Sequence, residues 1–144
     1  MKFLICGSRN WKNEKLLRKR IKAMLGENSE HTIINGGCRG ADVMSTQLAK
    51  DEGWTVKEYP ADWKKYKKAA GPIRNQQMII ENPDLDGVIA FSNNIKDSKG
   101  TQDMVFKANY NGIPVVLVSD PEVSWGREQE KQLSQQMESE KDGD

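Results

Sequence analysis

The fold is decided at residues 34–42, Ile34-Asn35-Gly36-Gly37-Cys38-Arg39-Gly40-Ala41-Asp42, where an apolar run passes into a helical pattern through three glycines and an arginine. Glycine in such a strand-to-helix turn lets backbone N–H groups approach an anion, and the N-terminus of the following helix carries partial positive charge. The spacing matches neither the dinucleotide-binding pattern GxGxxG nor the P-loop pattern GxxxxGK[ST]. The turn by itself therefore indicates a strand-to-helix unit and a general anion site.

Outward from this turn, short apolar runs alternate with longer amphipathic segments, a pattern typical of a parallel sheet covered by helices. The sequence predicts an α/β fold with a doubly wound, five-stranded parallel sheet and helices on both faces. Strands are expected over residues 2–6, 32–35, 54–59, 87–91 and 114–118, and helices over residues 13–25, 41–52, 71–82 and 101–110. This fold fills residues 1–118, and residues 119–144 are expected to form a polar C-terminal tail.

Two expectations concern the middle of the chain. Residues 60–71 are predicted to be a long basic connection, in which Trp63 anchors the loop to the core or Trp63 and Tyr66 stack on a base. Gly71-Pro72 supplies a helix start with proline at its favoured first position, and the helix that follows carries Ile73, Gln77 and Ile80 on one stripe.

The charge distribution is uneven although the net charge is only +1. Residues 1–82 hold 16 Lys and Arg against 9 Asp and Glu, whereas residues 83–144 hold 6 against 12. The N-terminal half therefore favours an anionic ligand, while the near-neutral chain as a whole argues against nucleic acid as a partner.

Cysteine and histidine are too few for a disulfide framework or a metal site, so neither a metal nor a cofactor is expected. Cys6 is expected in the core, Cys38 as a small packing residue and His31 on the surface. No apolar run approaches the roughly 18 residues of a membrane helix, and no signal peptide is recognisable. We expect a cytoplasmic protein with no membrane contact.

Four of the expected connections combine glycine with a basic residue, a hydroxyl or both. In a doubly wound sheet the strand-to-helix connections lie at the carboxyl edge, where ligands bind at the switch point in strand order. We expect one anion site there, in which Arg9, Arg39 and Arg74 meet a phosphate. Ser8 and Thr101 would donate hydroxyl hydrogen bonds. The other binding residues expected at this edge are Gly7, Gly36, Gly37, Gly40, Asn75, Ser98 and Gly100.

The same loops carry a family resemblance that spans nearly residues 3–118. The motifs are, in order, Gly7-Ser8-Arg9, Gly36-Gly37-Cys38-Arg39-Gly40-Ala41-Asp42, the run from Pro60-Ala61-Asp62-Trp63 to Ala69-Ala70-Gly71-Pro72-Ile73-Arg74-Asn75-Gln76-Gln77-Met78, and Gly100-Thr101-Gln102-Asp103-Met104. They resemble the YspA-related (cpYpsA-related) branch of the SLOG superfamily. The resemblance implies a modified Rossmann fold that binds a nucleotide or nucleotide-derived ligand. Related proteins are often dimers, so a homodimer is a further expectation.

The resemblance extends more distantly to the LOG phosphoribohydrolases, which release a base from a nucleoside 5′-monophosphate. Their motifs are RKxxM and PGGxGTxxE, and this chain departs from both. Asn75 replaces the lysine, both leading glycines of the second motif are absent, and Met104 stands where the glutamate belongs. In a hydrolase of this kind, Arg74 with Asp103 or Asp42 would be catalytic, since a carboxylate stabilises an oxocarbenium-like state and activates water. Each aspartate can equally serve the dipole of its helix.

Three functions stay open on the sequence alone. The first is binding of a nucleotide-derived small molecule at the carboxyl edge. The second is LOG-like hydrolysis of an N-glycosidic bond. The third is single-strand nucleic-acid binding of the DprA type, against which the near-neutral net charge argues.

Overall fold

The protein is described by a computed structural model over residues 1–27 and 30–123. Its strands are β1 (Lys2–Gly7), β2 (Thr32–Asn35), β3 (Thr55–Glu58), β4 (Gly87–Phe91) and β5 (Val115–Val118). Its α-helices are α1 (Glu14–Leu25), α2 (Ala41–Glu52), α3 (Trp63–Tyr66), α4 (Ala70–Glu81) and α5 (Lys99–Tyr110), and two short 3₁₀ helices are η1 (Lys67–Ala69) and η2 (Ile95–Asp97). The last strand ends at Val118. Most of the predicted C-terminal tail, residues 124–144, lies outside the described residues.

The five strands form one parallel sheet in the order β3-β2-β1-β4-β5, which confirms the predicted α/β, Rossmann-like fold. The chain winds outward from β1 to β3 and then returns to the other side of β1 to form β4. The order therefore reverses between β1 and β4, whose pairing runs from Phe3 opposite Gly87 to Gly7 opposite Phe91. This is the point at which such sheets bind ligands, beyond the carboxyl ends of the strands.

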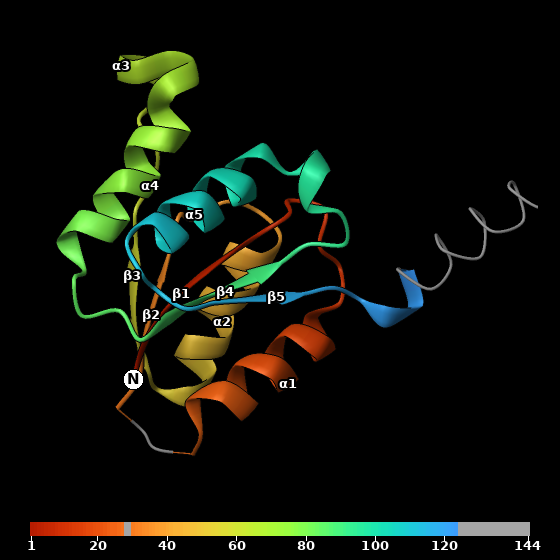
Figure 1. The fold of residues 1–144 in the computed structure, drawn as a ribbon. Helices are drawn as coiled ribbons and strands as arrows, with labels where there is room; N and C mark the ends of the chain where they lie inside the picture. Colours follow the sequence, from red (N-terminus) through yellow and green to blue (C-terminus); the bar gives the residue numbers. More distant parts are fainter. Residues whose placement is uncertain (28–29, 124–144) are drawn as a thin grey trace, which may run out of the picture.

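Helices cover both faces of the sheet (Figure 1), and each face has its own core. Helices α1 and α2 cover one face, where Leu17, Ile21 and Leu48 are fully buried against the strands. Helices α4 and α5 cover the other face with a smaller cluster that includes Met78 and Met104. Burial of these apolar side chains supplies the main stabilisation of the fold. None of the helices in the described part of the chain is long and apolar enough to cross a membrane.

Helix α4 buries a different face from the stripe that the sequence suggested. Ile73 and Ile80 are exposed, whereas Arg74, Asn75, Met78 and Ile79 are buried. Periodicity finds a helix face by its apolar residues, but here the buried face includes a guanidinium and an amide that find hydrogen-bond partners. The predicted stripe is therefore wrong, although the helix itself is present.

The basic connection predicted over residues 60–71 is mostly helical, and α4 begins within it at Ala70. The Asp62 side chain accepts a hydrogen bond from Lys65 N at 3.1 Å and caps α3, and η1 continues the helical path into α4. The segment projects beyond the end of the sheet (Figure 1). Trp63 does not anchor it to the core, because the side chain is 49 % exposed. A local helix cap thus organises a segment whose lysines suggested a loop.

His31 is buried, contrary to the predicted surface position. Its ring meets Trp54 edge-on at a centroid distance of 5.2 Å, and its Nδ1 lies 3.1 Å from the N-terminal nitrogen of Met1. His31, directly before β2, is thus covered by the N-terminus and by Trp54, directly before β3. Such tertiary cover leaves no mark in the local sequence pattern.

Candidate functional site

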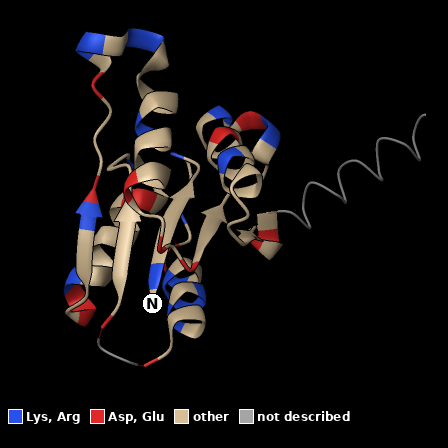
Figure 2. Ribbon diagram, turned by 60° about the vertical axis from the view of Figure 1, so that its left-hand side comes forward, with Lys and Arg blue, Asp and Glu red and all other residues tan. Residues whose placement is uncertain are grey.

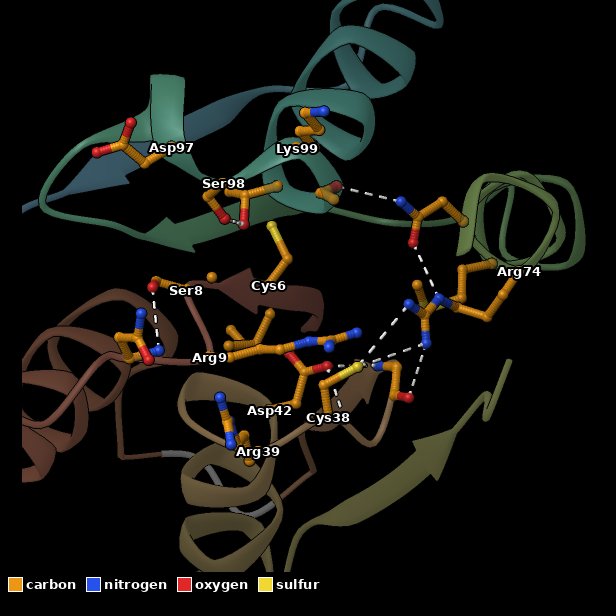
Figure 3. A pocket seen from close by; sticks show the side chains of 18 residues that line it. Cys6, Ser8, Arg9, Cys38, Arg39, Asp42, Arg74, Asp97, Ser98 and Lys99 are labelled. Atoms are coloured by element: carbon orange, nitrogen blue, oxygen red, sulfur yellow. Dashed lines mark hydrogen bonds between the residues drawn. The ribbon is translucent and has the colours of Figure 1, made fainter. Parts of the chain in front are cut away.

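A polar pocket of about 420 Å³ opens at the carboxyl ends of β1 and β4. Its volume is in the range of pockets that bind small organic ligands. The loop after β1, the glycine turn before α2, the first turns of α4 and the start of α5 all contribute to its walls (Figure 3). The structure therefore brings together three separate predicted loops and α4 at the switch point of the sheet. Of the predicted site residues, those lining the pocket are Gly7, Ser8, Arg9, Gly36, Arg39, Asp42, Arg74, Asn75, Ser98, Gly100 and Thr101.

The glycine turn already contains its own anion. Asp42 Oδ2 accepts hydrogen bonds from Gly36 N at 3.1 Å and Cys38 N at 3.2 Å. The Asn35 side chain accepts from Gly37 N at 2.9 Å. These three N–H groups, which the sequence predicted to bind a phosphate, are thus used within the protein: Asp42 folds back from the start of α2 to accept two of them, and Asn35 accepts the third. The N–H groups of this turn are therefore not available to an anionic group of a ligand, which would need donors elsewhere in the pocket.

Asp42 is a buried carboxylate at the edge of this pocket. Burial raises its pKa to about 6, against the opposing effects of the Cys38 N–H, the Arg74 charge and the Gly36 N–H. Its Oδ1 accepts no hydrogen bond from the described residues, which leaves one carboxylate oxygen for other chemistry. Its pKa lies within reach of neutral pH, which is where a general base is most effective.

Arg74 is a structural clamp more than a ligand-facing cation. It is 9 % exposed, and its Nη1 donates to Gly36 O at 2.8 Å and to Tyr59 O at 3.2 Å. Its Nε donates to the Asn75 side chain at 3.0 Å, and Nη2 lies 3.9 Å from Cys38 Sγ. The guanidinium ties α4 to the ends of β2 and β3, so most of its donors are unavailable to a ligand.

Three cations remain for a ligand. The side chains of Arg9, Arg39 and Lys99 line the pocket, are exposed, and make no hydrogen bond or ion pair with any residue in the described ranges. Arg9 enters from the loop after β1 and lies opposite Arg74 (Figure 3). Lys99 was not predicted as a site residue. Its place between Ser98 and Gly100 in a predicted loop was the available signal.

The N-terminus of α5 faces the same pocket. Ser98 precedes the helix but does not cap it, because its Oγ donates to Thr101 Oγ1 at 2.7 Å. The first N–H groups of a twelve-residue helix are thus without a side-chain cap, next to Gly100, where an added Cβ would meet nothing within 4 Å. This end carries the positive pole of the helix dipole.

Asp103 is not brought to the pocket wall. Its Oδ2 accepts hydrogen bonds from Asn75 Nδ2 at 3.0 Å and from Lys107 Nζ at 2.6 Å, between α4 and α5. Of the two predicted catalytic aspartates, only Asp42 lines the pocket. Gly37 and Gly40 also lie off this pocket. Gly40 has φ +85°, and an added Cβ would collide with Ser8 O, so its part is to let the two loops touch.

Both cysteines line the pocket as well. Cys6 is partly buried and packs against the core cluster under α4 and α5, and burial together with the charge of Asp42 raises the pKa of its thiol. Among the described residues no group of three or more His, Cys, Asp and Glu side chains is arranged to hold a metal ion.

Two comparisons with known proteins show the family of this chain. A family model for the YspA, cpYpsA-related SLOG family matches residues 1–66, which include the β1 loop, the glycine turn and Trp63. The Gene 61 protein of Mycobacterium phage D29 is 32 % identical over 123 residues, which cover 81 % of this chain and 95 % of that protein. The chain belongs to the YspA, cpYpsA-related SLOG family. Membership suggests in general terms a nucleotide-related small-molecule ligand.

The clamp makes Gly36 a position at which this SLOG chain tolerates no side chain. A Cβ there would overlap Arg74 Nη1 and lie 2.7 Å from its Cζ. We expect Gly36→Ala to lower the free energy of unfolding by about 2–3 kcal/mol, measured by urea denaturation. The matched control is Gly100→Ala in the first turn of α5, whose Cβ would meet nothing within 4 Å. It should be neutral or stabilise α5 by up to about 1 kcal/mol. Equal effects of the two changes would contradict the clamp.

Asp42 gives the stability of the protein a specific pH dependence. Its folded pKa of about 6 lies above the ordinary value of 3.8, so folding favours the protonated form. The stabilisation is present below about pH 4 and is lost as the pH rises through 6. Relative to Asp42→Asn, the wild type should lose about 2 kcal/mol between pH 4 and pH 7. Urea denaturation of both proteins across this range tests the prediction, and parallel pH profiles would contradict it.

Proposed function

We propose that this protein binds a nucleotide or nucleotide-derived small molecule in the pocket at the carboxyl ends of β1 and β4. The observation that carries the proposal is that one pocket is lined both by the N-terminus of α5, which has no side-chain cap, and by Arg9, Arg39 and Lys99, whose side chains have no partner among the described residues. An anion of phosphate size is the group that satisfies both features, because it accepts backbone N–H and guanidinium hydrogen bonds together.

The hydrogen bonds of Asp42 within the glycine turn narrow the proposed position of the phosphate. Asp42 fills the turn, so the phosphate belongs against α5, at Gly100 and Thr101, with Ser98 beside it. Arg9 and Arg39 then neutralise the ligand from the opposite wall. Asp42 lies between these elements with one carboxylate oxygen available, where it would accept a hydrogen bond from a ribose hydroxyl.

The proposal is tested by isothermal titration calorimetry at low salt with nucleoside 5′-monophosphates, cyclic nucleotides and ADP-ribose. Replacing both Arg9 and Arg39 by alanine should weaken the binding of the tightest ligand at least 10-fold, since a hydrogen bond to a charged group contributes about 1.5–3 kcal/mol. Arg20→Ala, which removes an exposed arginine from the far helix α1, should leave the affinity unchanged. The absence of binding by every compound, or equal affinities in the double variant and the wild type, would refute the proposal.

A second candidate function is hydrolysis of the N-glycosidic bond of a nucleoside 5′-monophosphate. The observation that favours it is Asp42, a pocket-lining carboxylate whose pKa burial raises to about 6. In this reaction Asp42 takes a proton from water as that water attacks the C1′ atom of the ribose, and the C1′–N bond electrons leave with the base. Arg74 would serve it indirectly, by holding the turn in which Asp42 lies.

Chromatography of nucleoside monophosphates incubated with the protein tests this second function. Free base and ribose 5-phosphate should appear at a rate that rises with pH through about 6, as Asp42 ionises. Asp42→Asn should lower the rate by at least 100-fold while the nucleotide still binds. Asp103→Asn is the comparison, because Asp103 does not line the pocket, and it should retain the rate. Intact substrate at every pH would leave binding as the function.

A further inference from the structure

We propose that Trp63 forms a nucleobase-stacking subsite in a second pocket that continues from the first. This inference rests on the proposed function and adds to it where the base of the ligand lies. The second pocket has a volume of about 530 Å³, and Arg9 and Arg39 lie on its border with the first. Gly36, Cys38 and Arg74 are also shared, so the two form one continuous groove with the arginines at its middle.

Trp63 is placed as a binding surface and not as part of the core. Its side chain is 49 % exposed, and it lines the second pocket beside Pro60 and Ala61. The ring edge lies close to α4, where a Cβ built on Gly71 would be 3.6 Å from Trp63 Cη2. The capped helix α3 fixes the backbone below it. A ring held at one edge with an open side is suited to stack on a planar group at little entropic cost.

The neighbouring charges decide which planar group fits. Trp63 lies next to the four lysines of the projecting segment, Lys64, Lys65, Lys67 and Lys68, which appear as the blue end of the ribbon in Figure 2. A cationic ligand would be repelled here, so an aromatic cage for an ammonium group is excluded. The base of an anionic nucleotide, with its phosphate beyond Arg9 and Arg39, satisfies both the aromatic surface and the charge.

Tyr66 is the other exposed aromatic residue of this segment, and it provides an internal comparison. Lys65 Nζ lies over its ring, 5.0 Å from the centroid, and Tyr66 lines neither pocket of the groove. Its ring face is therefore already covered by a cation. Of the two aromatic rings, only Trp63 presents a surface to the groove.

The test compares AMP with ribose 5-phosphate, which lacks the base, by isothermal titration calorimetry. Trp63→Ala should weaken AMP binding roughly 5- to 100-fold, the range found for loss of one base stack, and leave ribose 5-phosphate unchanged. Trp63→Phe, which keeps an aromatic ring, should stay within a few-fold of the wild type. Tyr66→Ala should bind both compounds as the wild type does. The tryptophan fluorescence of Trp63, obtained as the difference between the wild type and Trp63→Phe, should be quenched by AMP but not by ribose 5-phosphate.

Failures of the two proposals give different results. Unchanged AMP affinity in Trp63→Ala, or an equal loss for AMP and ribose 5-phosphate, would overturn the stacking subsite while leaving ligand binding intact. If the wild type binds neither compound nor any other nucleotide, the proposed function fails and the subsite fails with it.

Discussion

The hydrogen bonds from Arg74 to the main-chain oxygens of Gly36 and Tyr59 are the constraint on which the site depends. They join α4, on one face of the sheet, to the ends of β2 and β3. They also supply acceptors for the buried guanidinium, which would be costly to bury without partners. Gly36 must be glycine because the guanidinium occupies the space of a side chain. The turn before α2 thus takes its shape from α4, 38 residues further along the chain.

Once this turn is fixed, Asp42 completes it from within. The carboxylate satisfies two of the N–H groups that would otherwise require a ligand or water. The site is therefore preformed on the side of α2 and open on the side of α5. In the proposed binding mode the glycine-rich turn supports the site, and Arg9, Arg39, Lys99 and the start of α5 contact the ligand, in contrast to phosphate loops in which the glycines themselves hold the anion.

The sequence predicted the elements better than their buried faces. The predicted bounds of β2, α2 and β4 coincide with the observed ones, because alternation, apolar runs and terminal glycines are local signals. The convergence of the loops also followed from the sheet topology. The burial of Arg74, Asn75 and His31 did not, since each is buried by partners distant in sequence. The occupation of the turn by Asp42 was missed for a related reason: an aspartate at a helix start looks the same whether it faces solvent or folds back.

Catalysis of the LOG type would depend on a narrower set of groups here. Met104, at the position of the LOG glutamate, is 1 % exposed and belongs to the core beneath α5, so a carboxylate there would be buried among apolar side chains. Asp103, one residue earlier, is engaged by Lys107 and Asn75. The pocket is thus lined by two carboxylates, the buried Asp42 and the exposed Asp97, and by four cations that outnumber them, Arg9, Arg39, Arg74 and Lys99. Such a balance favours holding an anion and leaves turnover dependent on one group whose pKa lies near 6.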